Sequence, residues 1–161
     1  SIRAHLAEYD TSLAKNAPMN YCANAALNAL FGYYHEMAIQ AEIRTDWHIE
    51  LPEPLPLLEL DMAALFGNLM ENAIAGCRTV RPEARYFCLT TEVRHGNRLY
   101  IVSTNRFDGN IRKSKDGYRS TKHGGTGIGL ASITAVAEKY GGSAKASHSD
   151  TEFFVDVALK I

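Results

Sequence analysis

A run of glycines around residue 125 is the first feature whose residue types and spacing could do chemistry. The chain reads His123-Gly-Gly-Thr-Gly-Ile-Gly-Leu130 and then continues as an apolar helical pattern. Glycines let a backbone approach a phosphate closely, and the N-terminus of a helix offers free N–H groups and a positive dipole end. The spacing excludes G-x-x-x-x-G-K-[ST] and G-x-G-x-x-G, so the run predicts another kind of phosphate site. The alternative is a flexible loop that caps a helix.

Basic residues precede the glycines. Lys122 and His123 adjoin the run, and lysine binds phosphate as a point charge. The candidate phosphate contacts are therefore Lys122, His123, Gly125, Thr126, Gly127 and Gly129. The cations further upstream, Arg112, Lys113 and Lys115, are interpreted as an ordinary solvated loop surface.

Two asparagines four residues apart form the second candidate site. Asn68 and Asn72 lie in a predicted helix over residues 57–78, and their spacing places them on the same helix face. Amide oxygens are hard ligands that suit Mg²⁺, which keeps water ligands and shares the phosphates of its substrate. The pair therefore predicts a site for Mg²⁺ and phosphate, with an amide pair bonded to neighbouring backbone as the alternative.

The elements that must position these residues follow from the periodicity of apolar residues. Helices are predicted over 2–16, 20–41, 57–78 and 128–140, strands over 43–50, 85–94, 98–104 and 153–161, and a long polar loop over 106–126. The turn at residues 95–97 predicts a hairpin, and hairpins imply antiparallel pairing. The expected fold class is therefore α+β, a two-layer sandwich with a mixed, mostly antiparallel sheet.

Composition bounds the class of protein. The chain has 161 residues, of which 46% are apolar and 22% charged, as in globular domains. Its net charge of −1 argues against a nucleic-acid partner, because proteins that bind nucleic acids normally carry an excess of basic residues. The three cysteines form no C-x-x-C pair, so we expect reduced thiols in a cytosolic compartment.

Taken together, the motifs resemble a known family. Asn68-Leu-Met-Glu-Asn72-Ala-Ile, followed further along by Gly125-Thr-Gly127-Ile-Gly129-Leu, is similar to the N box and the G2 box of the GHKL (Bergerat) ATP-binding domain. More closely, the chain resembles the catalytic part of sensor histidine kinases of the accessory-gene-regulator type. That closer resemblance rests on Tyr118-Arg-Ser-Thr-Lys-His123, Asn105-Arg-Phe-Asp-Gly109 and Glu138-Lys-Tyr-Gly-Gly142.

The resemblance implies roles for single residues, with ATP and Mg²⁺ as cofactors. Asn72 matches the asparagine that binds Mg²⁺ between the ATP phosphates. Asn68 stands where hydrolysing relatives have a glutamate that activates water. Because an amide cannot take a proton, Asn68 argues for transfer of the phosphoryl group rather than hydrolysis. Lys122, His123 and the glycines at 125, 127 and 129 match the hinge and phosphate contacts of the ATP lid.

The G1 box is where this sequence departs from the family. Most members have an aspartate that accepts a hydrogen bond from the adenine amino group, whereas here the predicted strand leads into Asn105. Its side-chain carbonyl could accept that bond, more weakly than a carboxylate. Asp108 is the rival for this role, or a turn residue.

The resemblance also implies the organisation of a longer protein. Residues 1–45 resemble the end of a dimerisation and phosphoacceptor helical hairpin, and residues 46–161 the ATP-binding domain. We expect the acceptor histidine to lie before Ile2, outside this chain, and His5 to be a helix-surface residue. The implied partners are a response regulator and a second copy, which would pair through the hairpin. The implied location is the cytoplasmic portion of a membrane-anchored bacterial protein whose sensor region lies upstream.

Two other functions remain open on the sequence alone. The altered G1 box favours a nucleotide-binding regulatory module without transfer activity. A serine kinase of the anti-sigma type would share the fold, although the helices predicted over 2–41 argue against it.

Overall fold

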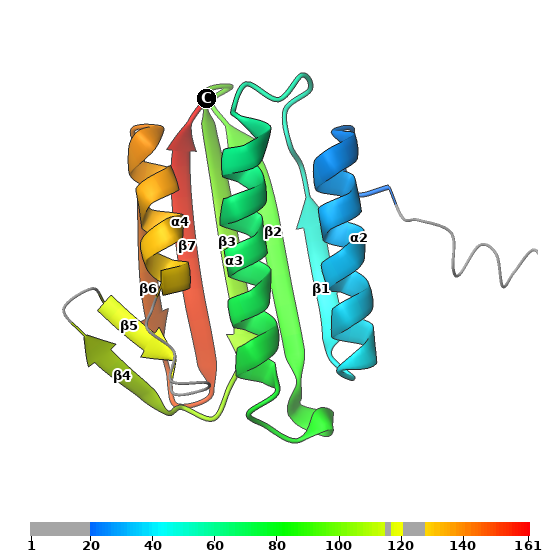
Figure 1. The fold of residues 1–161 in the computed structure, drawn as a ribbon, viewed down its shortest axis with the longest axis vertical. Coiled ribbons are helices and arrows are strands. Elements are labelled where there is room, and N and C mark those ends of the chain that lie inside the picture. Colours follow the sequence, from blue (N-terminus) through cyan, green and yellow to red (C-terminus); the bar gives the residue numbers. More distant parts are fainter. Residues whose placement is uncertain (1–19, 115–116, 121–127) are drawn as a thin grey trace, which may run out of the picture.

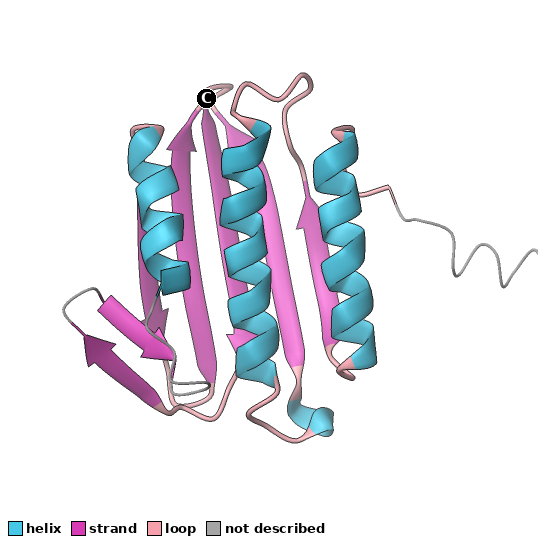
Figure 2. Cartoon of the chain, in the orientation of Figure 1, coloured by secondary structure: helices cyan, strands magenta, loops and turns pink. Residues whose placement is uncertain are grey.

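The protein folds as a two-layer sandwich in which three helices cover one face of a sheet (Figures 1 and 2). The structure is a computed structural model and describes residues 20–114, 117–120 and 128–161. The helices are α2 (Ala25–Gln40), α3 (Glu59–Cys77) and α4 (Ile128–Lys139), with a 3-10 turn at Pro82–Ala84. The strands are β1 (Arg44–Ile49), β2 (Tyr86–Arg94), β3 (Arg98–Arg106), β4 (Ile111–Ser114), β5 (Gly117–Ser120), β6 (Ser143–His148) and β7 (Glu152–Lys160).

The main sheet is mixed and mostly antiparallel, as the sequence predicts. Its five strands follow the order β1-β2-β3-β7-β6. The β1–β2 pair is parallel and is connected through α3, whereas β2–β3, β3–β7 and β7–β6 are antiparallel. The hairpin of β2 and β3 turns at His95 and Gly96, which both have positive φ. The predicted α+β sandwich is therefore confirmed.

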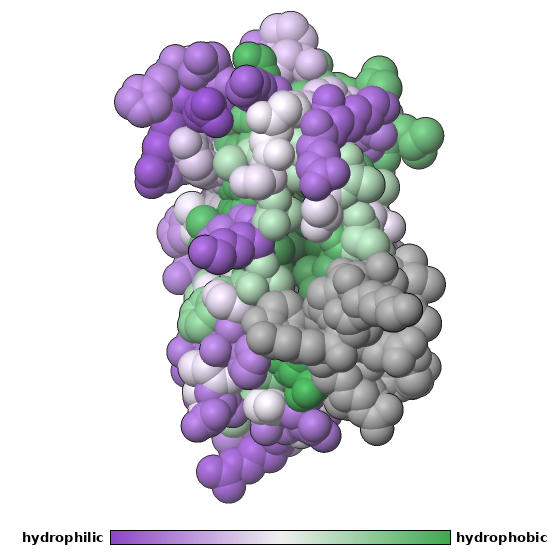
Figure 3. Space-filling view, turned by 90° about the vertical axis from the view of Figure 1, so that its left-hand side faces the viewer, coloured by the Kyte–Doolittle hydropathy of each residue, from purple (hydrophilic) through white to green (hydrophobic). Residues whose placement is uncertain are grey.

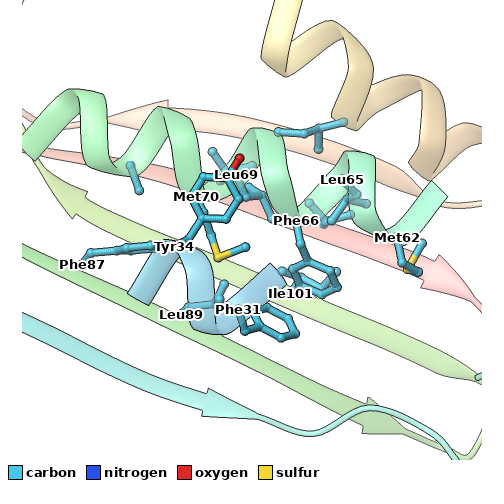
Figure 4. Close-up of a cluster of buried hydrophobic side chains, with 14 of the residues drawn as sticks. Phe31, Tyr34, Met62, Leu65, Phe66, Leu69, Met70, Phe87, Leu89 and Ile101 are labelled. Carbon is cyan, nitrogen blue, oxygen red and sulfur yellow. The ribbon is translucent and has the colours of Figure 1, made fainter. Parts of the chain in front are cut away.

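One core fills the space between the helices and the sheet. Strands β2, β3 and β7 alternate, so that Leu89, Ile101 and Val157 point toward the helices and are almost fully buried. Figure 4 shows the centre of this core, where the rings of Phe31 and Phe66 meet edge to face with centroids 4.9 Å apart. The core holds α3 in a fixed place above β2 and β3, which is the condition for a defined site on that helix.

Helix α2 belongs to the same core. Asn24 caps its N-terminus by accepting from the Leu27 N–H, which sets the helix start at residue 25 rather than at the predicted residue 20. Leu27, Phe31 and Ala38 are fully buried in one cluster with residues of α3 and the sheet. The helix that was predicted as part of a hairpin thus packs on the sandwich. The predicted division between residues 45 and 46 stays a prediction, and residues 1–19 lie outside the described part.

The segment predicted as a loop over residues 106–126 contains regular structure. Its described part includes β4 and β5, which pair as a two-stranded antiparallel hairpin apart from the main sheet. In Figure 1 this hairpin lies below the start of α4. The loop prediction was therefore wrong for these eight residues. Within the described residues, no helix is long and apolar enough to cross a membrane.

Candidate functional site

Three positions on α3 define one face of the candidate site. Asn68, Asn72 and Gly76 follow one another at intervals of four residues, so they form a stripe along one side of the helix. The two asparagines are half-buried, at the border between the core and the surface. The observed helix places Asn68 and Asn72 on one face, as their spacing in the sequence predicts.

Asn72 contacts the first turn of α4. A Cβ atom placed on Gly129 would lie 2.9 Å from Nδ2 and 3.0 Å from Oδ1 of Asn72. Real Cβ atoms almost never come so close to other heavy atoms, so the Asn72 amide fits against Gly129 because that residue has no side chain. The two motifs of the sequence, one on α3 and one at the start of α4, therefore meet in space.

Asn105 lies at the end of β3, beside the last turn of α3. Its side chain is 3% exposed, which makes it one of the few buried polar groups of the described residues. Its Nδ2 donates to the carbonyl oxygen of Arg106 at 2.9 Å and packs against Gly76. Asn105 thus stands next to the stripe on α3, one helical turn beyond Asn72.

Asp108 lies in a turn and uses its polar groups there. Its carboxylate accepts from the Asn110 N–H at 2.9 Å, and Gly109 between them has a positive φ of 82°. The Asp108 N–H donates to Thr79 Oγ1 at 3.0 Å. The side chain is exposed. Of the two rivals for the G1 position, Asn105 lies beside the α3 stripe, whereas Asp108 stabilises its own turn.

Asn68 and Glu71 each have a partner that limits their chemistry. The Asn68 amide donates to the Ala64 carbonyl oxygen at 2.7 Å, one turn back along α3. Glu71 is exposed and accepts from the Tyr34 hydroxyl at 2.9 Å. Burial and this hydrogen bond raise the pKa of Tyr34 to about 12. Glu71 therefore links α3 to α2.

Most of the remaining predicted site residues lie outside the described part of the chain. These are Lys122, His123, Gly125, Thr126 and Gly127, and Gly129 is the described member of that group. Figure 3 faces the α4 side of the molecule and shows apolar surface immediately beside the segment drawn in grey.

A polar cluster joins the start of α3 to the end of α4. The Tyr140 hydroxyl donates to Asp61 Oδ2 at 2.5 Å, and Lys139 Nζ lies 2.8 Å from the same oxygen. Hydrogen bonds from Lys139 and Tyr140 lower the pKa of Asp61. No sequence motif marks this cluster. Its one signal is the placement of an acidic residue in the first turn of one helix and a basic residue in the last turn of another.

Gly76 is the site residue that sequence reasoning missed. A side chain at this position would collide with the Asn105 amide and would also stand 3.4 Å from Phe107 Cβ. The available signal was its spacing of four residues from Asn72. That spacing predicts a shared helix face but says nothing about which strand end lies opposite.

The donor set suits Mg²⁺ held jointly with a phosphate. In the described part of the chain, no group of three or more His, Cys, Asp or Glu side chains could hold a metal ion. The Asn72 amide is half-buried beside the start of a helix, and its oxygen is a hard ligand. Mg²⁺ is commonly bound by one or two protein oxygens, several waters and substrate phosphates.

Comparison with known proteins identifies the family. The family model described as "GHKL domain" matches residues 57–160, which is most of the chain. No curated protein matches the chain. The similar solved structures show the fold alone, because their sequence identities are low.

Three of these structures illustrate the likeness. The mycobacterial sensor histidine kinase MprB has a TM-score of 0.59 at 13% identity and covers 83% of this chain and 95% of its own. The Acinetobacter baumannii histidine kinase AdeS has a TM-score of 0.60 at 14% identity, and the match covers 99% of this chain and 78% of AdeS. The catalytic domain of histidine kinase ThkA has a TM-score of 0.60 at 16% identity, and the match covers 84% of this chain and 91% of the ThkA chain. The fold is thus that of histidine kinase catalytic domains, and the chain belongs to the GHKL domain family.

Proposed function

We propose that this chain is the catalytic portion of a two-component sensor histidine kinase of the accessory-gene-regulator type. It binds Mg-ATP and transfers the γ-phosphoryl group to a histidine, from which it passes to an aspartate of a response regulator. The observation that carries the proposal is the contact of Asn72 with Gly129. This contact joins the metal-binding amide of one motif to the phosphate-binding helix start of the other.

The described residues supply binding and orientation. Asn72 would hold Mg²⁺, which would neutralise phosphate charge when bound. The backbone at Gly129 lies in the first turn of α4, where N–H groups and the helix dipole favour an anion. Asn105 would accept a hydrogen bond from the base. Phosphoryl transfer needs little beyond this positioning and charge neutralisation.

Asn68 determines which acceptor is used. At this place on α3 a carboxylate would activate water, whereas the Asn68 amide donates to the Ala64 carbonyl and has no basic lone pair. Water is therefore a poor nucleophile at this site, so transfer of the phosphoryl group requires a stronger nucleophile. In the proposed protein that nucleophile is a histidine on a helical hairpin, which also forms the homodimer. The sensor region would lie upstream in the membrane, with this portion in the cytoplasm.

Titration with ATP in the presence of Mg²⁺ or of a chelator tests the binding step. We expect the wild-type chain to bind ATP more tightly with Mg²⁺, and Asn72→Ala to lose this difference because it lacks the amide oxygen. Asn97→Ala, in the exposed turn before β3, should match the wild type. No binding at about 1 mM Mg-ATP, the upper end of common substrate affinities, would contradict the proposal.

A chain that carries the proposed helical hairpin with its acceptor histidine, incubated with γ-labelled ATP, tests the transfer step. Acid-labile label indicates phosphohistidine and supports the proposal. Acid-stable label indicates phosphoserine and favours a serine kinase. Binding without any label favours a regulatory module. Asn72→Asp should abolish labelling, because it adds negative charge beside the phosphates and changes the metal site.

A further inference from the structure

The amide of Asn105 is held in one orientation by its surroundings. Its Nδ2 donates to the carbonyl oxygen of Arg106 at 2.9 Å, and the side chain is 3% exposed. If the amide turned over, its Oδ1 would face that carbonyl oxygen, and two acceptors would meet in a buried place without a proton between them. The backbone of the following residue therefore selects the orientation of the amide.

Gly76 provides the space for this orientation. A Cβ atom at residue 76 would collide with Asn105 Nδ2 and would stand 3.5 Å from the Arg106 carbonyl oxygen. Gly76 lies within α3 and has no positive φ, so its conformation does not require glycine. The amide nitrogen occupies the volume that a side chain at residue 76 would fill.

We propose that Gly76 and the Arg106 carbonyl adapt position 105 to an amide and exclude an ionised carboxylate there. Residue 76 is then a further positioning residue of the site, since it acts through Asn105. With Nδ2 used in the protein, Asn105 offers a ligand its Oδ1, which is an acceptor. Where a base turns its C6 position toward this acceptor, the acceptor binds adenine, which has an amino group at C6, and disfavours guanine, which has a carbonyl oxygen there. This last step rests on the proposed function.

The proposal predicts that Asn105→Asp, which restores the usual residue of the family, lowers the stability of the folded protein. At neutral pH the new carboxylate would face the Arg106 carbonyl oxygen while nearly buried, an arrangement that opposes ionisation. A protonated carboxyl has an O–H that can donate to the Arg106 carbonyl and so replaces the amide N–H. The pKa of the introduced carboxyl should therefore rise above its ordinary value of about 3.9 in the folded state.

The sign of the pH dependence follows from this raised pKa. The folded variant holds its proton to higher pH than the unfolded chain does. Its stability is therefore closest to that of the wild type below about pH 4, and it falls as pH rises toward the folded pKa. A general loss of packing would lower stability by the same amount at every pH.

Thermal unfolding without nucleotide tests the proposal independently of ATP binding. We would compare wild type, Asn105→Asp and Asn97→Asp from about pH 4 to pH 8. Asn97 precedes β3 and is exposed, so it offers the same chemical change at the other end of the strand. We expect the melting temperature of Asn105→Asp to fall below both others as pH rises. A constant difference, or none, would overturn the proposal.

Binding of ATP and GTP then tests the consequence for the base. We expect the wild type to favour ATP. We expect Asn105→Asp to bind ATP roughly tenfold more weakly at neutral pH, because a carboxylate that turns away from the Arg106 carbonyl oxygen no longer presents its acceptor to the base, a loss of about one hydrogen bond. Gly76→Ala should also weaken ATP binding, because the new methyl displaces the amide. Tighter ATP binding by Asn105→Asp would overturn the proposal, as would equal binding of ATP and GTP by the wild type. A wild type that binds neither nucleotide while the pH-dependent melting holds would contradict the proposed function and leave the amide orientation supported.

Discussion

At the scale of single residues, the site depends on glycines that make space. Gly129 and Gly76 both lie in helices, and neither has the positive φ that glycine alone adopts easily. Each stands against an asparagine amide, Asn72 in one case and Asn105 in the other. The requirement at both positions is therefore volume. Substitution should act on the asparagine rather than on the local backbone.

Gly129→Ala should weaken Mg-ATP binding and lower stability, because its methyl would overlap the Asn72 amide. Alanine favours the helix by about 1 kcal/mol over glycine, and overpacking costs about 1–3 kcal/mol, so the collision should outweigh the gain. Calorimetric titration with Mg-ATP and thermal unfolding would measure the two effects.

Gly67→Ala is the matched control for this change. A Cβ at residue 67 would meet the Tyr34 hydroxyl at 3.7 Å, which is ordinary contact. This variant should gain the helix propensity without a collision and should melt at a higher temperature. If Gly129→Ala behaved like Gly67→Ala, then Asn72 would not lie against Gly129.

The candidate site was predictable at this scale only in part. The residue types and the spacing of Asn68, Asn72 and Gly129 predict a metal and phosphate site, and the structure brings Asn72 and Gly129 together. Which of Asn105 and Asp108 lies buried beside α3, and which closes its own turn, was not predictable, because both facts depend on tertiary packing. The contact of Gly76 with Asn105 joins two segments distant in sequence, and no local pattern encodes it.

At the scale of elements, α3 and α4 are joined at the end away from Gly129. The N-cap residue of α3, Leu58, provides no side-chain hydrogen bond to the helix. Instead its N–H donates to the Tyr140 hydroxyl at 3.1 Å, and that hydroxyl donates to Asp61. Tyr140, the residue after α4, thus accepts a hydrogen bond at the start of α3, where backbone N–H groups lack helical partners. The two helices are thereby fixed along their shared length.

Tyr140→Phe should lower the melting temperature by about 2–4 °C, since it removes a hydroxyl that bonds both Leu58 and Asp61. The pKa of Asp61 is lowered in the folded protein by hydrogen bonds from Lys139 and Tyr140. Its contribution is present above the ordinary pKa of about 3.9 and is lost as pH falls through the lower folded value. The difference between variant and wild type should therefore shrink in strong acid.

Tyr33→Phe is the control for this prediction. Tyr33 is 61% exposed, and its ring meets Tyr34 edge to face with centroids 5.0 Å apart. Removing its hydroxyl should leave the melting temperature unchanged. Equal melting of both variants at neutral pH would mean that Tyr140 does not fasten the helices.

The elements were predictable where apolar periodicity is strong. The alternation in residues 85–94 and 98–104 predicts β2 and β3 almost to the residue, because one face of each strand is buried. Strands β4 and β5 were missed, since they pair outside the main sheet in a polar, basic segment that carries no alternation of apolar residues. Pairing between two polar strands leaves little trace in a sequence.

At the scale of the whole molecule, the position of the domain boundary decides how much of the chain folding requires. The sequence predicts a boundary after residue 45, whereas α2 buries Leu27, Phe31 and Tyr34 in the common core. The match to ThkA covers 84% of this chain, a share larger than residues 46–161 alone. A helix that fills a core in this way is costly to remove, since each large side chain contributes about 1.5–3 kcal/mol by burial.

A chain that begins at residue 46 should therefore fail to fold cooperatively, whereas one that begins at residue 20 should melt in a single transition. The shorter chain exposes Phe66 and Met70, which α2 covers in Figure 4. Circular dichroism during heating would measure both chains. A cooperative transition and Mg-ATP binding by residues 46–161 would instead establish the boundary that the sequence predicts.

The aromatic rings that pack between α2 and β1, an edge strand of the main sheet, have an optical consequence. Trp47 is the one tryptophan of the chain and lies on β1, where its ring meets His35 and Phe31 of α2 with centroids 4.9 Å and 6.4 Å away. Its Nε1 is buried and has no hydrogen-bond partner among the described residues. The fluorescence of this indole therefore reports whether α2 is docked on β1. With α3 between α2 and α4, an unlabelled sample can reveal detachment of α2 separately from nucleotide binding near α4.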